Sequence, residues 1–369
     1  NFKSTDALHR YGIRTREIGL NWAKADSRFD LSKEVNEPNK VGYVVEIDPL
    51  NPNSTPKKHT ALGRFKHENA ELVISKDGKI IVYMGDDERG EYLYKYVSNE
   101  SMNEVKDKST LLSNGNLYVA KFNDNFTGEW LLLDTQTTGL SSKAEVCVFT
   151  RLAASKVGAT TMDRPEWIAS NPKKNEVCCC LTNNKNRGIK TNKGGDKVDV
   201  DKVNPRKNNK YGQIVRWKPR DNNHSSVYFE WDLFVVAGNP NVHDDKNRGS
   251  ENIDKENMFN SPDGLKFDKY GRLWIQTDGN YSNSGDFKGM GNNQMLIADT
   301  NTGKIKRFMV GPKECEVTGL TFAPDYKTVF VGIQHPGERL GSNFPDNGNN
   351  KPRSCIIAIQ KKDGSEILT

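Results

Sequence analysis

The chain has 369 residues, a low mean hydropathy and a formal net charge of +6. No apolar run approaches the roughly 18 residues of a membrane-spanning helix, which excludes a membrane span. Its 15 Phe, 12 Tyr and 6 Trp supply enough aromatic area for a folded core, which excludes a disordered chain. The sequence shows no helical recognition pattern and no strand-borne aromatic pair typical of RNA binding, so we expect no nucleic-acid partner.

Residues 1–40 are polar and irregular, and they begin without Met and without the regions of a signal peptide, so we expect that upstream sequence has been removed. Two segments have helical patterns: a weak one at Arg10–Lys24, and Lys143–Val157, an amphipathic helix expected to cap the fold. The remaining pattern is β. The predicted strands are Val41–Ile47, several between Glu68 and Ser98, Leu117–Phe122, Gly128–Leu133, Val177–Leu181, Gln213–Trp217, Tyr228–Val236, Leu265–Phe267, Leu273–Thr277, Gln294–Asp299, Ile305–Val310, Leu320–Phe322, Val329–Ile333 and Cys355–Gln360.

Four segments of the chain share one arrangement, in which an acidic residue precedes a short apolar run, a turn and a second β-rich run. The acidic residues are Glu68, Glu166, Asp263 and Glu316. This recurrence predicts an all-β fold, a β-propeller whose innermost strands aim the acids into one central channel. No alternation of helices and strands points to a parallel sheet. We therefore expect residues 1–369 to form a single propeller domain with long loop insertions.

Several carboxylates in one channel can hardly all stay ionised unless cations hold them, so the pattern predicts a metal site. Arg164 lies two residues before Glu166, and on an extended strand the two side chains share a face. A planar guanidinium beside metal-bound carboxylates suits a phosphate group, because it grips two oxygens at once. The alternative interpretation is an ordinary Arg–Glu pair on a strand edge.

Three further features have two interpretations each. The acidic turn Gly85–Arg89 is either a calcium-binding turn or a polar hairpin turn. His67 and His335 have a functional interpretation, in which they orient a ligand or protonate a leaving group. In the structural interpretation they are hydrogen-bonded residues without such a role. The basic stretch Asn184–Lys210 has few apolar anchors and predicts a solvated loop, with a basic rim that attracts anionic substrates as the alternative.

The six cysteines do not form the pattern of a disulfide framework or of a structural zinc site. Cys178, Cys179 and Cys180 are consecutive in a predicted strand, so only the first and third share a face. We expect them, with Cys147, Cys315 and Cys355, to be buried thiols. Cys315 precedes Glu316 directly, and pleat alternation turns its thiol away from the predicted site.

Several motifs together resemble the PhoX family of bacterial alkaline phosphatases, and the resemblance runs from about Tyr11 to the C-terminus. The motifs are Ala61–Ala70, Val82–Arg89, Met162–Trp167, Ser261–Leu265 and Glu316–Phe322. The resemblance implies a propeller of about six blades, partly incomplete here, with short capping helices. It implies Fe³⁺ and Ca²⁺ ions, with Glu68, Glu166, Asp263 and Glu316 as metal ligands and Arg164 as the phosphate-contacting residue.

The same resemblance implies a protein that is exported by the twin-arginine route to a periplasmic or extracellular location. We expect a monomer that hydrolyses small phosphate monoesters, with some diester activity. The family's N-terminal portion ends in a Cys-Glu-Glu motif whose cysteine resembles an iron ligand. This chain lacks that portion, so we expect a propeller truncated at its N-terminus. Two alternatives remain: a calcium-stabilised, non-catalytic binding platform, and a lactonase-type hydrolase with a single calcium, against which Arg164 argues.

Overall fold

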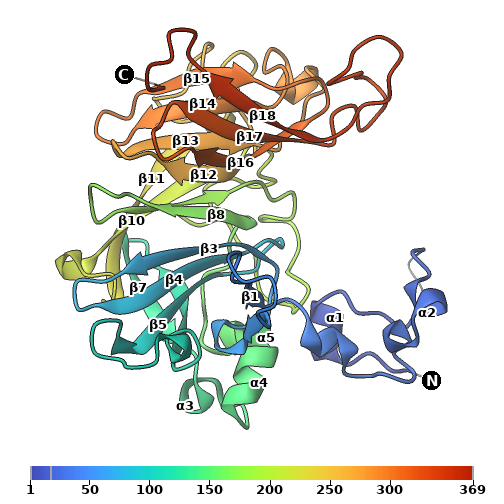
Figure 1. Ribbon diagram of the computed structural model, residues 1–369, viewed down its shortest axis with the longest axis vertical. Helices are drawn as coiled ribbons and strands as arrows, with labels where there is room; N and C mark the ends of the chain where they lie inside the picture. The colour runs from blue at the N-terminus through green and yellow to red at the C-terminus, as the bar shows by residue number, and fades with distance from the viewer. Residues whose placement is uncertain (1, 17–18, 368–369) are drawn as a thin grey trace.

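The computed structural model describes residues 2–16 and 19–367, which form successive antiparallel β-meanders stacked along the long axis of the molecule (Figure 1). The first blade comprises β3 His67–Ile74, β4 Lys79–Asp86, β5 Leu93–Ser101, β6 Gly115–Phe122 and β7 Thr127–Leu132. The second comprises β8 Pro165–Ser170, β9 Val177–Leu181, β10 Gln213–Pro219 and β11 Tyr228–Val236. The third comprises β12 Pro262–Phe267, β13 Arg272–Thr277, β14 Gln294–Asp299 and β15 Ile305–Val310, and the fourth β16 Glu316–Phe322, β17 Thr328–Gln334 and β18 Cys355–Gln360.

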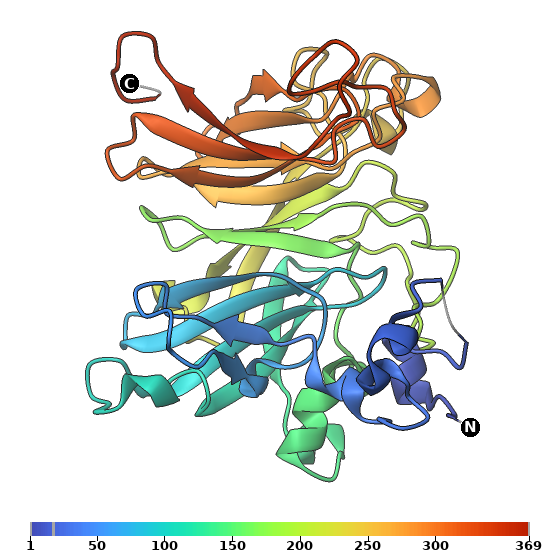
Figure 2. The same ribbon diagram turned by 45° about the vertical axis from the view of Figure 1, so that its right-hand side comes forward.

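The innermost strands β3, β8, β12 and β16 lie next to one another in chain order, and Figure 2 shows the blades as successive layers from blue at the bottom to red at the top. The first two blades also join at their outer edges, where β7 pairs with β11 and Phe229 lies opposite Gly128, so that they form one sheet of nine strands. The predicted all-β, propeller-like architecture is confirmed.

The apolar core is divided among the spaces between the blades. In the second blade, Cys178 and Cys180 pack toward β12–β14 of the third blade, whereas Cys179 packs toward β4 and β5 of the first blade. Because β9 is covered on both faces, all three thiols are fully buried. The prediction from the two-residue period of a strand is confirmed.

The five α-helices among the described residues are short. They are α1 Asp6–Arg10, α2 Trp22–Ala25, α3 Thr135–Thr138, α4 Lys143–Val148 and α5 Thr150–Lys156. The predicted helix Lys143–Val157 is present as α4 and α5, which are separated at Phe149 and pack against the core of the first blade.

The predicted helix Arg10–Lys24 is wrong as a continuous element, because α1 ends at Arg10 and α2 begins at Trp22, with residues 17 and 18 outside the described part. Gly12 and Gly19 have φ of 80° and 111°, which an α-helix does not accommodate. The predicted strand Val41–Ile47 is shorter than expected: β1 covers Val44–Glu46 and pairs with β2 Lys57–His59.

The loop Asn184–Lys210 is not a freely solvated segment, which corrects the leading prediction for it. Arg187 is fully buried, and its Nε donates to Asp163 Oδ1 at 2.7 Å while its Nη2 donates to the carbonyl of Thr161 at 2.8 Å. Polar side chains, including Asn184, Asn204 and Asn209, anchor the loop where apolar residues are scarce. Among the described residues, no helix has the length and apolar character that crossing a bilayer requires.

Candidate metal centre

Three of the four predicted acids lie inside a β-bulge near the start of an inner strand. The strand register shifts between His67 and Ala70 around Glu68, and equivalent shifts enclose Glu166 in β8 and Asp263 in β12. A bulge leaves a residue unpaired and re-aims its side chain. Glu316 differs, because it pairs with Gln334 and the bulge of β16 follows it, between Thr318 and Thr321.

A second repeat appears in the backbone. Arg164, Ser261 and Glu314 each lie two residues before an acid, and their φ angles are 56°, 51° and 58°. Non-glycine residues rarely adopt this left-handed conformation, which costs about 1–3 kcal/mol and clusters at functional sites. The chain therefore makes the same unusual turn into three of the inner strands.

The first group of acids consists of Glu68, Asp87 and Glu166, whose carboxylate oxygens lie within 4.8 Å of one another. Asp87 comes from the turn after β4, and Gly85 permits this approach: a Cβ at Gly85 would lie 2.5 Å from the carbonyl oxygen of Pro165. The close approach of β4 to β8 thus places a third acid beside the two predicted ones.

Arg164 is bound to this group through two acids. Its Nε and Nη2 donate to the two carboxylate oxygens of Asp87 at 2.7 and 3.0 Å, and its Nη2 also donates to Glu166 Oε1 at 3.0 Å. Within the described part of the chain, Nη1 of Arg164 makes no hydrogen bond. Carboxylates therefore hold Nε and Nη2 of the guanidinium, and Arg164 also belongs to the lining of a cavity.

The second group consists of Asp278, Glu316 and His335, which also offer ligand atoms within 4.8 Å of one another. The Nε2 of His335 lies 3.4 Å from Glu316 Oε2, and Nε2 of Gln334 donates to the same oxygen at 2.7 Å. Asp278 follows β13, and His335 follows β17. Asp278 and His335 thus each follow the second strand of their blade, as Asp87 does in the first blade.

Asp263 connects the two groups electrostatically. Burial and then the charges of Glu316, Asp278 and Glu68 raise the pKa of Asp263 well above its usual range. Burial and the charges of Asp263, Asp87 and Glu68 likewise raise the pKa of Glu166, and burial and Asp278 raise the pKa of Glu316 to about 7. The carboxylates at the propeller axis are thus one interacting set whose negative charge Arg164 compensates only in part.

Sequence reasoning missed Asp87 and Asp278 as members of this set. Asp87 directly follows Asp86, which pairs with His67, and Asp278 directly follows Thr277, which pairs with Pro262. The sequence feature that could have identified both residues is therefore a polar residue directly after the second strand of each unit. Of these two residues, only Asp87 lies in a segment that the sequence marks as acidic, the turn Gly85–Arg89.

The turn Gly85–Arg89 divides between the two interpretations. Asp87 faces the site, whereas Asp86 is fully buried and forms a two-bond pair with Arg151 at 2.6 and 2.7 Å. Glu88 binds Lys66 and Lys193.

His67 fits the structural interpretation. Its Nε2 lies 3.1 Å from the carbonyl oxygen of Gly63, its ring stacks on Phe65 at 3.7 Å, and burial lowers its pKa to about 4. Cys315 is fully buried in the core between the third and fourth blades, as predicted.

The donor set fits hard cations. It consists of carboxylate oxygens and one imidazole, and hard cations such as Ca²⁺ prefer oxygen ligands. The Nδ1 of His335 is buried without a hydrogen-bond partner among the described residues. Cations would neutralise the mutual repulsion that raises these pKa values. Fold and site together define a propeller-like protein with a carboxylate-rich axial site that suits cations.

Comparison with known proteins assigns the family. A family model described as "Alkaline phosphatase PhoX" matches residues 1–337, and the chain belongs to this family. It is also similar to the structure of Pseudomonas fluorescens PhoX in complex with vanadate, a transition state analogue, with 53% identity and a TM-score of 0.94. The match covers 99% of this chain and 65% of that one, so this chain spans somewhat less than two thirds of that relative.

Other structural matches are weak. Kuenenia stuttgartiensis hydrazine synthase is 11% identical with a TM-score of 0.35, and the match covers 86% of this chain and 68% of that one. A putative TolB from Agrobacterium tumefaciens is 8% identical with a TM-score of 0.30, and the match covers 85% and 82% of the two chains. No curated protein sequence matches the chain.

Proposed function

We propose that this chain is the catalytic propeller of a metal-dependent phosphatase that hydrolyses phosphate monoesters, with some diester activity. One observation carries the proposal: the Arg164 guanidinium is fixed by Asp87 and Glu166 at the edge of the carboxylate set, where Arg164 also lines a cavity. Membership of the PhoX family and similarity to the vanadate complex support it.

The residues that would hold the cations are the predicted ligands Glu68, Glu166, Asp263 and Glu316, together with Asp87, Asp278 and His335. Fe³⁺ and Ca²⁺ are the ions that the family resemblance implies, and both suit this oxygen-rich set. When bound, the cations supply Lewis acidity toward phosphoryl oxygens and lower the pKa of water.

Arg164 binds and orients the phosphoryl group. Its Nε and Nη2 stay on Asp87 and Glu166, so the guanidinium plane is fixed before substrate arrives, and Nη1 is left to donate to a phosphoryl oxygen. A fixed donor stabilises the charge that develops on the transferring group without reorganising during the reaction. Asp87 therefore acts both on the cations and on the orientation of Arg164.

The remaining parts of the proposal follow from the family. We place the protein in the periplasm or outside the cell, exported by the twin-arginine route, as a single-domain monomer acting on small phosphorylated substrates. A non-catalytic calcium platform would not require an arginine guanidinium fixed beside the acids. A single-calcium lactonase would not require one either.

Elemental analysis and turnover of p-nitrophenyl phosphate, with and without added calcium, test the proposed function. We expect iron with several calcium ions in the protein, and calcium-dependent release of nitrophenolate. Calcium alone, with no turnover, would show a binding platform instead.

A further inference from the structure

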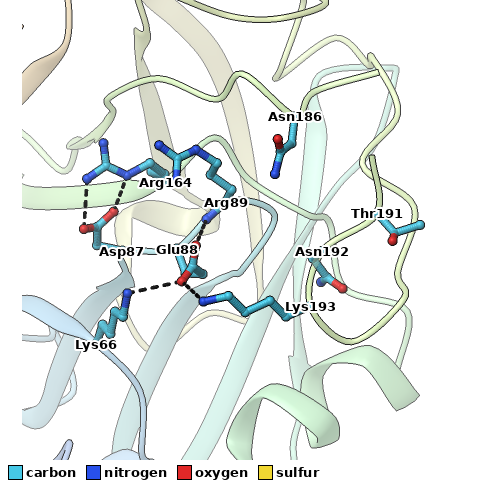
Figure 3. Close-up of a pocket in the computed structure, with 9 residues that line it drawn as sticks. All are labelled: Lys66, Asp87, Glu88, Arg89, Arg164, Asn186, Thr191, Asn192 and Lys193. Atoms are coloured by element: carbon cyan, nitrogen blue, oxygen red, sulfur yellow. Dashed lines mark hydrogen bonds and ion pairs between the residues drawn. The ribbon is translucent and has the colours of Figure 1, made fainter. Parts of the chain in front are cut away.

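We propose that the cavity beside Arg164 is a second anion-binding subsite, which selects phosphate esters whose leaving group bears another phosphate or a carboxylate. This inference rests on the proposed function and adds the substrate class to it. The cavity measures about 480 Å³, a size typical of small-molecule sites. Its lining residues, drawn in Figure 3, are Lys66, Asp87, Glu88, Arg89, Arg164, Asn186, Thr191, Asn192 and Lys193.

The cavity adjoins the candidate metal centre directly. Asp87 belongs to the Glu68–Asp87–Glu166 group and also lines the cavity, and Arg164 binds two acids of that group while it lines the same space. A phosphoryl group held by Arg164 would therefore have its leaving group in the cavity.

The cavity lining has more cations than anions, in contrast to the metal centre. Glu88 alone accepts from two ammonium groups, Lys193 Nζ at 2.6 Å and Lys66 Nζ at 3.2 Å, and Figure 3 shows both side chains reaching toward it. One carboxylate cannot neutralise two ammonium groups. An excess positive charge therefore remains in the cavity lining.

Arg89 adds a second uncompensated charge. Its backbone N–H donates to Glu88 Oε1 at 3.1 Å, but no carboxylate pairs with its guanidinium in the part of the chain that the structure describes. Its Nε is buried without a hydrogen-bond partner. A guanidinium without a carboxylate partner among the described residues, in the lining that also contains Lys66 and Lys193, suits a bidentate anion such as phosphate or carboxylate.

The opposite wall is fixed before any ligand binds. It comes from the loop at Thr191–Lys193, where Nδ2 of Asn192 donates to the carbonyl of Gly90 at 2.9 Å and to Asp196 at 2.9 Å. Asp196 in turn accepts from Nη2 of Arg10 at 3.0 Å. Since the loop is tied down on both sides, Lys193 is presented to an anion with little further ordering cost.

The test compares two esters with one carbon skeleton, propane-1,3-diyl bisphosphate and propyl phosphate. The measured quantity is the ratio of their kcat/KM values, with the metal-loaded protein and phosphate release as the readout. We expect the ratio in the unaltered protein to favour the bisphosphate about tenfold, and Arg89→Gln to reduce it by on the order of tenfold, the usual effect of a charge-assisted hydrogen bond. The preference also falls with added salt.

Lys193→Gln serves as the second variant, since Lys193 lies on a surface loop, and we expect it to lower the ratio as well. Lys190→Gln removes an equal charge from the same loop outside the cavity lining, and it should keep the ratio unchanged. As a binding readout, the inhibition constant of 3-phosphonopropionate should rise more in Arg89→Gln than that of propylphosphonate.

Hydrolysis of both esters with a ratio that neither Arg89→Gln nor Lys193→Gln alters would overturn the subsite and leave the proposed function standing. Hydrolysis of neither ester by the metal-loaded protein would overturn the proposed function, and the subsite with it.

Discussion

The Nε of Arg164 lies 2.7 Å from Oδ1 of Asp87, although 77 positions separate the two residues in the chain. Asp87 follows β4 of the first blade, and Arg164 precedes β8 of the second. The contact therefore exists only because the two blades pack side by side. It fixes the guanidinium at the point where an anionic substrate would meet the acidic centre.

Replacing Arg164 by Lys should impair catalysis far more than folding. Lysine keeps the charge but loses the planar fork that binds Asp87, Glu166 and the phosphoryl group together. We expect kcat/KM for a phosphate monoester to fall by the equivalent of about 2–4 kcal/mol, comparable to the loss of one preorganised donor. Steady-state kinetics on protein with verified metal content measure this.

Arg353→Lys, at an exposed pair with Asp346, is the control. Near-unaltered turnover by Arg164→Lys, with metals bound, would make Arg164 a structural partner of Glu166.

Asp86 and Asp87 are neighbours with opposite expected effects. Asp86→Asn removes the carboxylate that accepts two hydrogen bonds from Arg151 and leaves, among the described residues, only Glu91, at 3.8 Å, to pair with this buried guanidinium, which should lower the free energy of unfolding by about 3–5 kcal/mol. Asp87→Asn should reduce metal content and phosphatase turnover with a much smaller change in stability. Chemical denaturation and elemental analysis of both variants separate the two roles. A large loss of stability in Asp87→Asn with normal metal content would contradict this assignment.

Chelation should abolish activity and lower the melting temperature together, because the carboxylates then repel one another without cations. Asp263→Asn should have opposite effects in the two states: it raises the melting temperature of the chelated protein and lowers that of the metal-loaded protein. Differential scanning calorimetry of both proteins, with and without chelator, checks this. An unchanged melting temperature on chelation would show that the acids do not hold cations.

Lys95 should make stability depend on pH outside the metal centre. Its side chain is fully buried beside Trp130, and burial lowers its pKa to about 7. Between that value and the ordinary lysine pKa of about 10.4, the unfolded chain holds a proton that the folded chain lacks. Stability from this group therefore rises as the pH increases through this window, by up to about 1.4 kcal/mol per pH unit.

Lys95→Met should remove this dependence, and the free energy of unfolding from denaturant titrations between pH 7 and 10 measures it. Lys218→Met, on an exposed position of β10, should keep the slope of the unaltered protein. An equal slope in Lys95→Met would show that Lys95 stays protonated through its bond to the carbonyl of Ser226.

The sequence by itself determined the repeating unit. An acid, an apolar run, a turn and a second apolar run are local features, and a strand's period of two follows from its covalent geometry. Glu68, Glu166, Asp263 and Glu316 were therefore identifiable as equivalent residues, and Cys178 and Cys180 could be assigned to one face. The helical structure of the amphipathic segment Lys143–Val157 could also be predicted from the sequence, except for its break at Phe149.

Only the tertiary structure decided which acids share a centre and which groups remain unpaired. Asp87 and Asp278 join the set because strand pairing brings the ends of β4 and β13 to the propeller axis, and pairing between distant segments leaves no local signature. The same packing pairs Asp86 with Arg151 and places Arg89 in the lining of a cavity. The loop Asn184–Lys210 looked solvated because its anchors are polar, and hydrogen bonds, unlike apolar patterning, reveal their partners only in three dimensions.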